Sequence, residues 1–196
     1  MQLHRKHVLD GAIAILDEYG LADLTMRRLA SSLGVQPGAL YWHFPNKQTL
    51  LGAVADRILE PVDAPVLSDT WDDQIAELAH RLRNAMLAHR DGADLVAASF
   101  AARTTTTRTR RLFVDAALRA EMSRSEAELT ADTLLYYVLG QTVDEQARMQ
   151  LDSVGALAED ASPLFDSPDA TARFDFGLRL FVGGVREVLV AGTGHG

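Results

Sequence analysis

One short segment, Gln36–His43, carries side chains whose types and spacing suit the recognition of nucleic acid bases. Gln36 can form two hydrogen bonds with adenine, and the methyl group of Ala39 can pack against the methyl group of thymine. Tyr41 and Trp42 offer flat apolar contacts or a hydrogen bond to phosphate. We therefore expect this segment to meet base edges in the major groove of DNA.

Side chains around this segment suit the DNA backbone. They are expected at helix starts and ends, where phosphate contacts position a protein without specifying the sequence. The predicted DNA-binding residues are Thr25, Arg27, Gln36, Pro37, Ala39, Tyr41, Trp42, His43 and Lys47.

Three aromatic residues in this region admit two interpretations. Tyr41, Trp42 and Phe44 could all be core residues of a small three-helix unit. However, three aromatics within four positions cannot all point inward from one helix. We assign Phe44 to the core and expect at least one of the other two to be exposed.

Two short helices joined by a tight turn must position these side chains. Thr25 is the expected N-cap of a helix that begins at Met26, and Gly34 can adopt the left-handed conformation that ends it. Pro37 suits the first turn of the next helix, which we expect to run to about Phe44. This arrangement is a helix-turn-helix, whose second helix enters the major groove.

A further helix on each side completes the predicted N-terminal head. An apolar stripe predicts a first helix that Gly20 ends, and Asn46 is the expected N-cap of a fourth helix, from Lys47 to about Glu60. Prolines disfavour helix over residues 61–65, which makes this stretch the best domain boundary. The stripe of the first helix consists of Val8, Ala12, Ile15, Leu16 and Tyr19.

The remaining sequence also predicts helices. The first is expected over 71–89 and is ended by Gly92, and the second passes through Leu112, Phe113, Ala116 and Leu118. The third passes through Tyr136 and begins at a capping box at Ser123 or Ser125. The last is expected over 170–191, after a loop over 150–170. The tract Thr104–Thr107 is helix-poor. Gly177, Gly183 and Gly184 inside the last helix indicate a close helix–helix approach, since glycine costs about 1 kcal/mol there. The helices around Tyr136 and over 170–191 could form a four-helix dimer interface or fill the core of a monomer.

Composition limits the classes of function. The 196 residues are 47% hydrophobic and 23% charged, as in an ordinary folded protein, and the net charge of −8 at first argues against nucleic acid. The first 50 residues nevertheless contain five Lys or Arg and four Asp or Glu, so the acidic excess lies in the remainder. The absence of cysteine fits a reducing compartment, and no apolar run is long enough for a signal or a membrane span. We expect a cytoplasmic protein without a membrane segment.

A recognisable pattern surrounds the helix-turn-helix. Leu33-Gly34-Val35, then Leu40-Tyr41-Trp42-His43-Phe44, Asn46-Lys47 and Leu50-Leu51, resembles the DNA-binding head of the tetracycline-repressor (TetR) family. A weaker resemblance continues through Trp71, residues 89–93 and Leu139-Gly140. Within the family, the sequence is most similar to the tetracycline-repressor branch. The resemblance implies an all-α homodimer with a three-helix DNA-binding head (1–48), a connecting helix and linker (49–63), and a helical effector-binding and dimerisation body (64–196).

The resemblance also implies an inducer pocket in the body. Drug-binding members use polar residues and a metal there, whereas the corresponding positions here are Asp63, Leu78, Val96 and Leu112. We therefore predict a more apolar inducer, with no metal and no cofactor. The expected lining residues are Leu78, Leu82, Val96, Phe100, Leu112 and Leu135, with Asp144 where those members place an acidic residue. The alternatives are ordinary core positions and a solvated Asp144.

The predicted function is a ligand-responsive repressor that binds a palindromic double-stranded operator as a homodimer and is released by a small-molecule inducer. An activator or a ligand-binding helical protein of the same fold is the alternative. A small cytosolic enzyme is the third possibility, because the chain has six histidines and the acidic pairs Asp72-Asp73 and Glu159-Asp160. No metal-binding His pair, phosphate-binding glycine loop or nucleophile elbow accompanies them, so we predict no catalytic residue.

Overall fold

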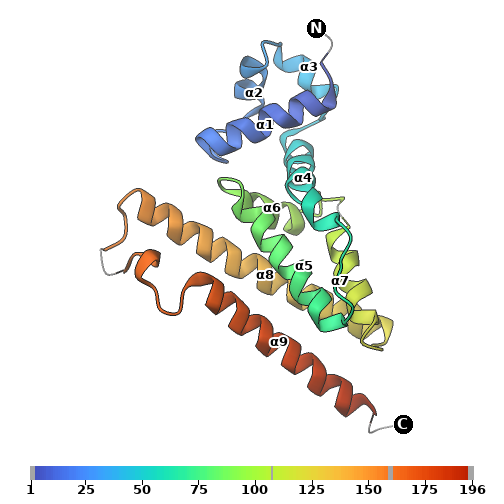
Figure 1. Cartoon of the computed structure of the whole chain (residues 1–196). Coiled ribbons are helices and arrows are strands. Elements are labelled where there is room, and N and C mark those ends of the chain that lie inside the picture. The colour runs from blue at the N-terminus through green and yellow to red at the C-terminus, as the bar shows by residue number, and fades with distance from the viewer. Residues whose placement is uncertain (1–2, 107, 159–160, 194–196) are drawn as a thin grey trace. The chain divides into compact units, whose positions relative to one another are not determined.

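The computed structural model describes residues 3–106, 108–158 and 161–193, and within these residues every regular element is a helix (Figure 1). The prediction of an all-α protein is confirmed. The chain forms two compact units, Met1–Ala64 with Leu82–Thr107, and Pro65–Arg81 with Arg108–Gly196, so α5 contributes to both. Thr107 and the Glu159-Asp160 pair lie outside the described residues.

The head begins with α1 (Arg5–Tyr19), which buries Val8, Ala12, Ile15 and Leu16 as its apolar stripe predicts. Gly20 ends this helix with a φ of +88°. The placement of Tyr19 on the buried stripe was wrong, because its side chain is 41% exposed. The guanidinium of Arg28 instead lies 3.7 Å from the centre of the Tyr19 ring, a cation–π contact at the surface.

Local signals define the next helices. α2 (Met26–Ser32) begins where the Thr25 side chain accepts a hydrogen bond from the Arg28 backbone N–H, and Gly34 follows with a φ of +65°. α3 (Pro37–Tyr41) has Pro37 in its first turn but is shorter than predicted. It stops before Phe44 because the N–H groups of His43 and Phe44 both donate to the Leu40 carbonyl in a tight turn.

The connecting helix α4 (Lys47–Ile58) starts at its predicted cap, where the Asn46 side chain accepts from the Thr49 N–H at 2.8 Å. A single turn of 3-10 helix, η1 (Glu60–Asp63), then occupies the stretch where the prolines predicted no helix. Pro61 fits this short turn because the first turn of a helix does not use its missing N–H.

Gly92 does not end a helix, as was predicted, but lies at the start of one. α5 (Trp71–Leu87) ends before it, and Gly92 opens α6 (Gly92–Ala101), a helix that was not predicted. A β-carbon at Gly92 would lie 2.3 Å from the Met86 carbonyl oxygen, so glycine is required by this close approach rather than as a helix stop.

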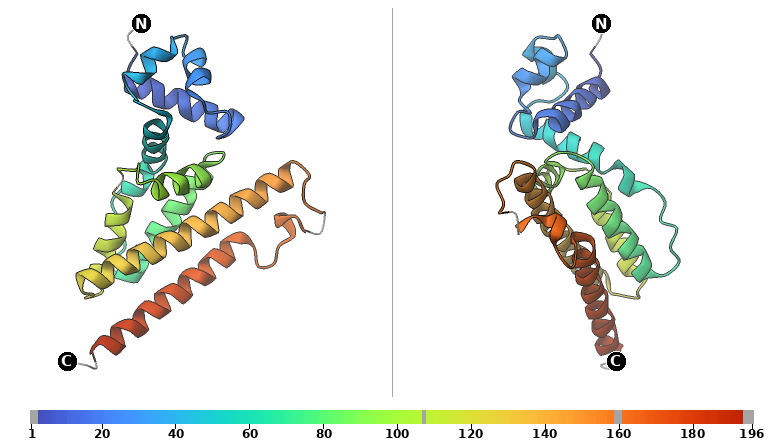
Figure 2. Two further views of the ribbon diagram at one scale, coloured as in Figure 1. Left: turned by 180° about the vertical axis from the view of Figure 1, so that it is seen from behind. Right: turned by 60° about the vertical axis from the view of Figure 1, so that its left-hand side comes forward.

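The second unit contains α7 (Thr109–Leu118), α8 (Arg124–Ser153) and α9 (Ala170–Thr193). The capping box that starts α8 is the Ser123–Glu126 pair, not Ser125. α8 continues into the predicted loop over residues 150–153, and a 3-10 turn, η3 (Pro163–Phe165), lies before α9. α8 and α9 lie side by side, and they bury apolar residues that include Val138, Phe174 and Leu178 (Figures 1 and 2).

Candidate DNA interface and surfaces of the body

The recognition segment separates core from surface as the sequence predicts. Leu40 and Phe44 are fully buried, whereas Tyr41 is 49% exposed and Trp42 is 91% exposed. An exposed tryptophan is unusual, because aromatic side chains normally bury much of their area. The turn that ends α3 therefore presents two aromatic side chains to solvent, while Leu40 and Phe44 on either side of them are buried.

The other predicted DNA-binding residues lie at the start of α2, on α3 and at the start of α4. Thr25, Arg27, Gln36 and Pro37 are exposed, and Ala39, His43 and Lys47 are half-buried. No neighbouring atom lies within 4 Å of a β-carbon placed at Gly38, so the start of α3 is open to a partner. Their contacts with DNA remain predictions.

Sequence reasoning missed the role of Arg5. Its Nη1 donates to the His43 carbonyl oxygen at 3.1 Å, and its guanidinium lies 4.2 Å from the centre of the Phe44 ring. These contacts join the first turn of α1 to the end of the recognition segment. Residues 38 positions apart meet here, and no local sequence signal reports such a pair.

The end of α1 is held by the turn between α5 and α6. The Leu21 N–H donates to Asp91 Oδ2 at 2.7 Å, and Arg90 Nη1 donates to the Glu18 carbonyl at 3.2 Å. His89 Nδ1 lies 3.0 Å from Asp17 Oδ1. The head is therefore attached to α6 by side-chain contacts as well as through α4.

α4 is fastened to the segment that follows α6. The Asp56 carboxylate accepts hydrogen bonds from both the backbone N–H, at 2.8 Å, and the hydroxyl of Thr106. A β-carbon at Gly52 would lie 2.4 Å from the Thr104 carbonyl oxygen, so the two backbones touch at a glycine. α4 is therefore in direct contact with the segment that follows α6.

The predicted effector-binding residues fall in both compact units. In the first unit Leu82 and Val96 are buried and Phe100 is half-buried; in the second, Leu78 and Leu135 are buried and Leu112 is half-buried. These burials suit both a pocket lining and an ordinary core.

Asp144 differs from this apolar set in its exposure. It is exposed and lines a pocket of about 320 Å³ between α8 and the start of α9, together with Arg148 and Arg173. Both arginines are already paired with Asp166, at 3.4 and 3.0 Å. Among the residues that the structure describes, no three His, Asp or Glu side chains gather where they could hold a metal ion.

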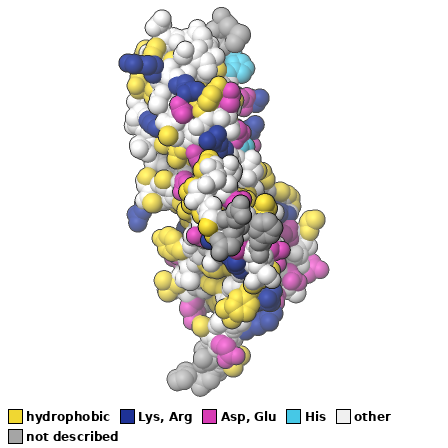
Figure 3. All heavy atoms as spheres, turned by 90° about the vertical axis from the view of Figure 1, so that its left-hand side faces the viewer, with side chains coloured by type: hydrophobic (Ala, Val, Ile, Leu, Met, Phe, Trp, Pro, Cys, Tyr) yellow, Lys and Arg dark blue, Asp and Glu magenta, His cyan; other side chains and the backbone are white. Residues whose placement is uncertain are grey.

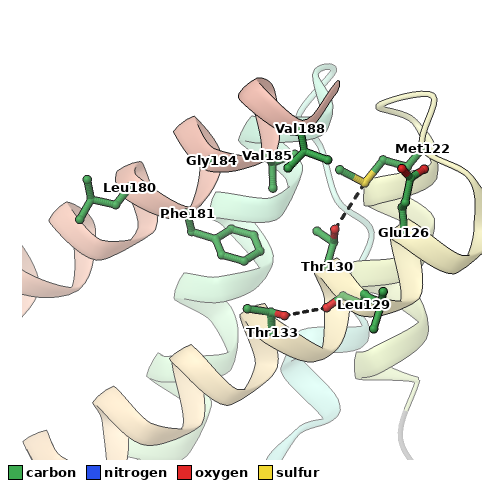
Figure 4. Close-up of a pocket in the computed structure, with 10 residues that line it drawn as sticks. All are labelled: Met122, Glu126, Leu129, Thr130, Thr133, Leu180, Phe181, Gly184, Val185 and Val188. Carbon is green, nitrogen blue, oxygen red and sulfur yellow. Dashed lines mark hydrogen bonds between the residues drawn. The ribbon is translucent and has the colours of Figure 1, made fainter. Parts of the chain in front are cut away.

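An apolar groove of about 450 Å³ runs between the first half of α8 and the second half of α9 (Figure 4). Leu129, Leu180 and Val188 line it and are 66%, 63% and 54% exposed. Its threonine hydroxyls are satisfied within the chain, because Thr130 donates to the Met122 sulfur and Thr133 to the Leu129 carbonyl. The groove therefore presents mainly carbon, and we call it the α8–α9 groove.

Comparison with known proteins identifies this combination of head and body. The profile described as "Bacterial regulatory proteins, tetR family" matches residues 8–54, and "Tetracyclin repressor-like, C-terminal domain" matches residues 64–189. The chain belongs to the TetR family. It is therefore a DNA-binding transcriptional regulator, as the sequence predicted, and the matching family consists of regulatory proteins rather than enzymes.

Three TetR-type relatives extend over nearly the whole chain. BioQ from Mycobacterium smegmatis is 49% identical to this chain with a TM-score of 0.85, and the match covers 94% of this chain and 98% of that chain. A structure of BioQ with its natural double-stranded DNA operator is 45% identical with a TM-score of 0.79, and that match also covers 94% and 98%. The class E tetracycline repressor of Escherichia coli is 33% identical over 190 residues, 90% of this chain and 88% of that protein. A variant of TetR from Acinetobacter baumannii AYE, in complex with minocycline, is 28% identical with a TM-score of 0.75, covering 95% and 98%. None of the helices described in this TetR-family chain has the length and apolar character that a membrane crossing needs.

Proposed function

We propose that this TetR-family chain represses transcription by binding a palindromic operator as a homodimer and leaves the operator when a small molecule binds its body. The observation that carries the proposal is the recognition segment, in which Tyr41 and Trp42 project to solvent while Leu40 and Phe44 hold the turn in the core. Similarity to BioQ, which has been solved with its operator, supports DNA as the partner.

The homodimer would form through the α8–α9 groove. Exposed apolar patches on a folded protein mark interaction sites, and two helices from each subunit can build a four-helix interface. Gly184 lines the groove, and a β-carbon placed there would meet no atom of the same chain within 4 Å. A second copy could therefore approach this part of α9 closely.

Release from the operator would follow from the attachment of α4 to the segment after α6. An effector that binds better to the state unable to bind DNA lowers operator affinity by that difference in binding free energy, typically about 1–3 kcal/mol. The Asp56–Thr106 hydrogen bonds and the Gly52–Thr104 contact would carry the displacement into the helix that supports the head.

The inducer is proposed to be an apolar small molecule. Similarity to a repressor bound to minocycline supports a small-molecule effector in general. The predicted lining residues carry no group that could hold a metal-bound drug in the same way. They are Leu78, Leu82, Val96, Phe100, Leu112 and Leu135.

We further propose that the protein acts on DNA in the cytoplasm and has no catalytic activity. The sign of regulation separates a repressor from an activator of the same fold. Transcription of the neighbouring genes, measured with and without the protein, should rise when a repressor is removed.

Operator binding itself can be tested with DNA from the intergenic region beside the gene. We expect Tyr41→Ala and Lys47→Ala each to weaken binding by about 1–3 kcal/mol, or roughly fivefold or more, while size-exclusion chromatography still shows a dimer. Leu67→Ala is the matched control, because Leu67 is also strongly exposed but lies outside the head. If both head variants bind the operator like the unmodified protein, the proposal is wrong.

A further inference from the structure

The first turn of α1 lies beside the recognition segment and carries a cluster of basic groups. The Arg5 contacts with His43 and Phe44 fix its position. His4, Lys6 and His7 follow the same turn and are exposed, and the rings of His4 and His7 lie edge to face with centroids 5.5 Å apart. Figure 3 shows Lys, Arg and His side chains exposed on the face of the head that it presents.

These groups are available to a ligand. The His4 side chain makes no capping hydrogen bond at the start of α1, and no acidic residue occupies the first turn of that helix. Lys6 pairs with Asp10 at 3.4 Å, but the Lys6 side chain is 75% exposed. An ion pair this exposed contributes little, so the lysine can exchange the carboxylate for another anion.

The head also needs cations for a DNA backbone. The recognition segment Gln36–His43 contains no Lys or Arg. Arg28 is engaged by the Asp23 carboxylate and the Tyr19 ring. Phosphate neutralisation supplies much of the affinity of DNA-binding proteins. Arg27 and Lys47 alone would give the head few ionic contacts with DNA phosphates.

We propose that His4, Lys6 and His7 form a second phosphate-binding edge of the head, which holds the operator backbone next to the bases that the recognition segment meets. This inference rests on the proposed operator binding. Arg5 acts as the positioning residue, because it ties the edge to the end of the recognition segment.

Salt dependence of binding tests the edge directly. Each phosphate contact adds about 0.9 to the slope of log affinity against log salt, so losing one contact in each of two heads should lower the slope by about 1.8. We expect Lys6→Gln to produce this change and to weaken binding to operator and to unrelated DNA by the same factor, roughly tenfold or more in 0.1 M salt.

Arg124→Gln is the matched control for charge. Arg124 is 71% exposed and pairs with Glu128 four residues away, just as Lys6 pairs with Asp10, but it lies in the other compact unit. This variant removes the same charge from the chain and should leave the salt slope unchanged.

The histidines add a second test, because both side chains are exposed and a ring N–H can donate to a phosphate oxygen. We expect the double variant His4→Ala, His7→Ala to weaken binding to operator and to unrelated DNA by the same factor. A separate His43→Gln variant distinguishes the contribution of the recognition segment.

The outcomes separate this inference from the proposed function. If the unmodified protein binds no operator, the proposed function fails. If Tyr41→Ala weakens binding but Lys6→Gln keeps the normal salt slope and the double histidine variant binds DNA like the unmodified protein, the second edge is refuted and the proposed function stands. A Lys6→Gln effect confined to the operator, with unrelated DNA unaffected, would also overturn a backbone contact.

Discussion

Replacing Leu180 with aspartate should separate the two subunits. Covering a leucine side chain completely stabilises a structure by about 1.5–3 kcal/mol. Leu180 is 63% exposed in the single chain, so covering the exposed part contributes about 1–2 kcal/mol. A two-fold interface contains the residue twice, which gives about 2–4 kcal/mol for the dimer. This corresponds to a dissociation constant raised roughly 30-fold to several hundred-fold, before the cost of burying a carboxylate is added.

Analytical ultracentrifugation over a range of concentrations would measure this change, with circular dichroism to verify that the helices persist. Leu67→Asp is the matched control, because Leu67 is 84% exposed but lies before α5, outside the α8–α9 groove. We expect this control to dimerise like the unmodified protein. A Leu180→Asp variant that keeps its helices and dimerises normally would refute the assignment of the groove to the interface.

Two further predictions concern stability. A β-carbon at Gly177 would lie 2.3 Å from the Tyr137 hydroxyl, so Gly177→Ala should lower the free energy of unfolding by about 1–3 kcal/mol in urea denaturation, despite the better helix propensity of alanine. Gly183→Ala is the control: its β-carbon would meet no atom of its own chain within 4 Å, so this substitution should leave the free energy of unfolding unchanged or raise it. The Ser68 hydroxyl donates to Glu77 Oε2 at 2.7 Å and lowers the pKa of that carboxyl. The stability that this hydrogen bond gives to the folded state is therefore present above about pH 4.3 and is lost as the pH falls through the lowered pKa. Ser68→Ala should therefore reduce stability by about 1 kcal/mol at pH 7 and by clearly less at pH 3, and an equal loss at both would contradict this explanation.

Helix starts and stops were predictable from the sequence where one side chain or one backbone conformation determines them. The Thr25 and Asn46 caps, the left-handed Gly34 and Pro37 at the start of α3 all occur as expected. These signals act within three or four residues, which is the range over which sequence patterns can be interpreted directly.

Features that depend on distant contacts were not predictable in the same way. Gly92 was interpreted as a stop because glycine commonly follows a helix, but its position is determined by the Met86 carbonyl that packs against it. Tyr19 contacts Arg28 at the surface, and Arg5 contacts His43 and Phe44. Periodicity describes one helix at a time, whereas these contacts join two.

The head carries few positive charges, so its affinity for DNA should depend on the dimer interface. A head with five Lys or Arg residues in its first 50 positions can neutralise few phosphates, so tight operator binding should require two heads held together. Leu180→Asp should then weaken operator binding even though it leaves every head residue unchanged, and the salt slope should fall to about half because one head binds at a time. Lys6→Gln, by contrast, should remove a fixed increment from the slope and leave the dimer intact. The pair of measurements therefore distinguishes affinity lost through dissociation from affinity lost at the DNA surface.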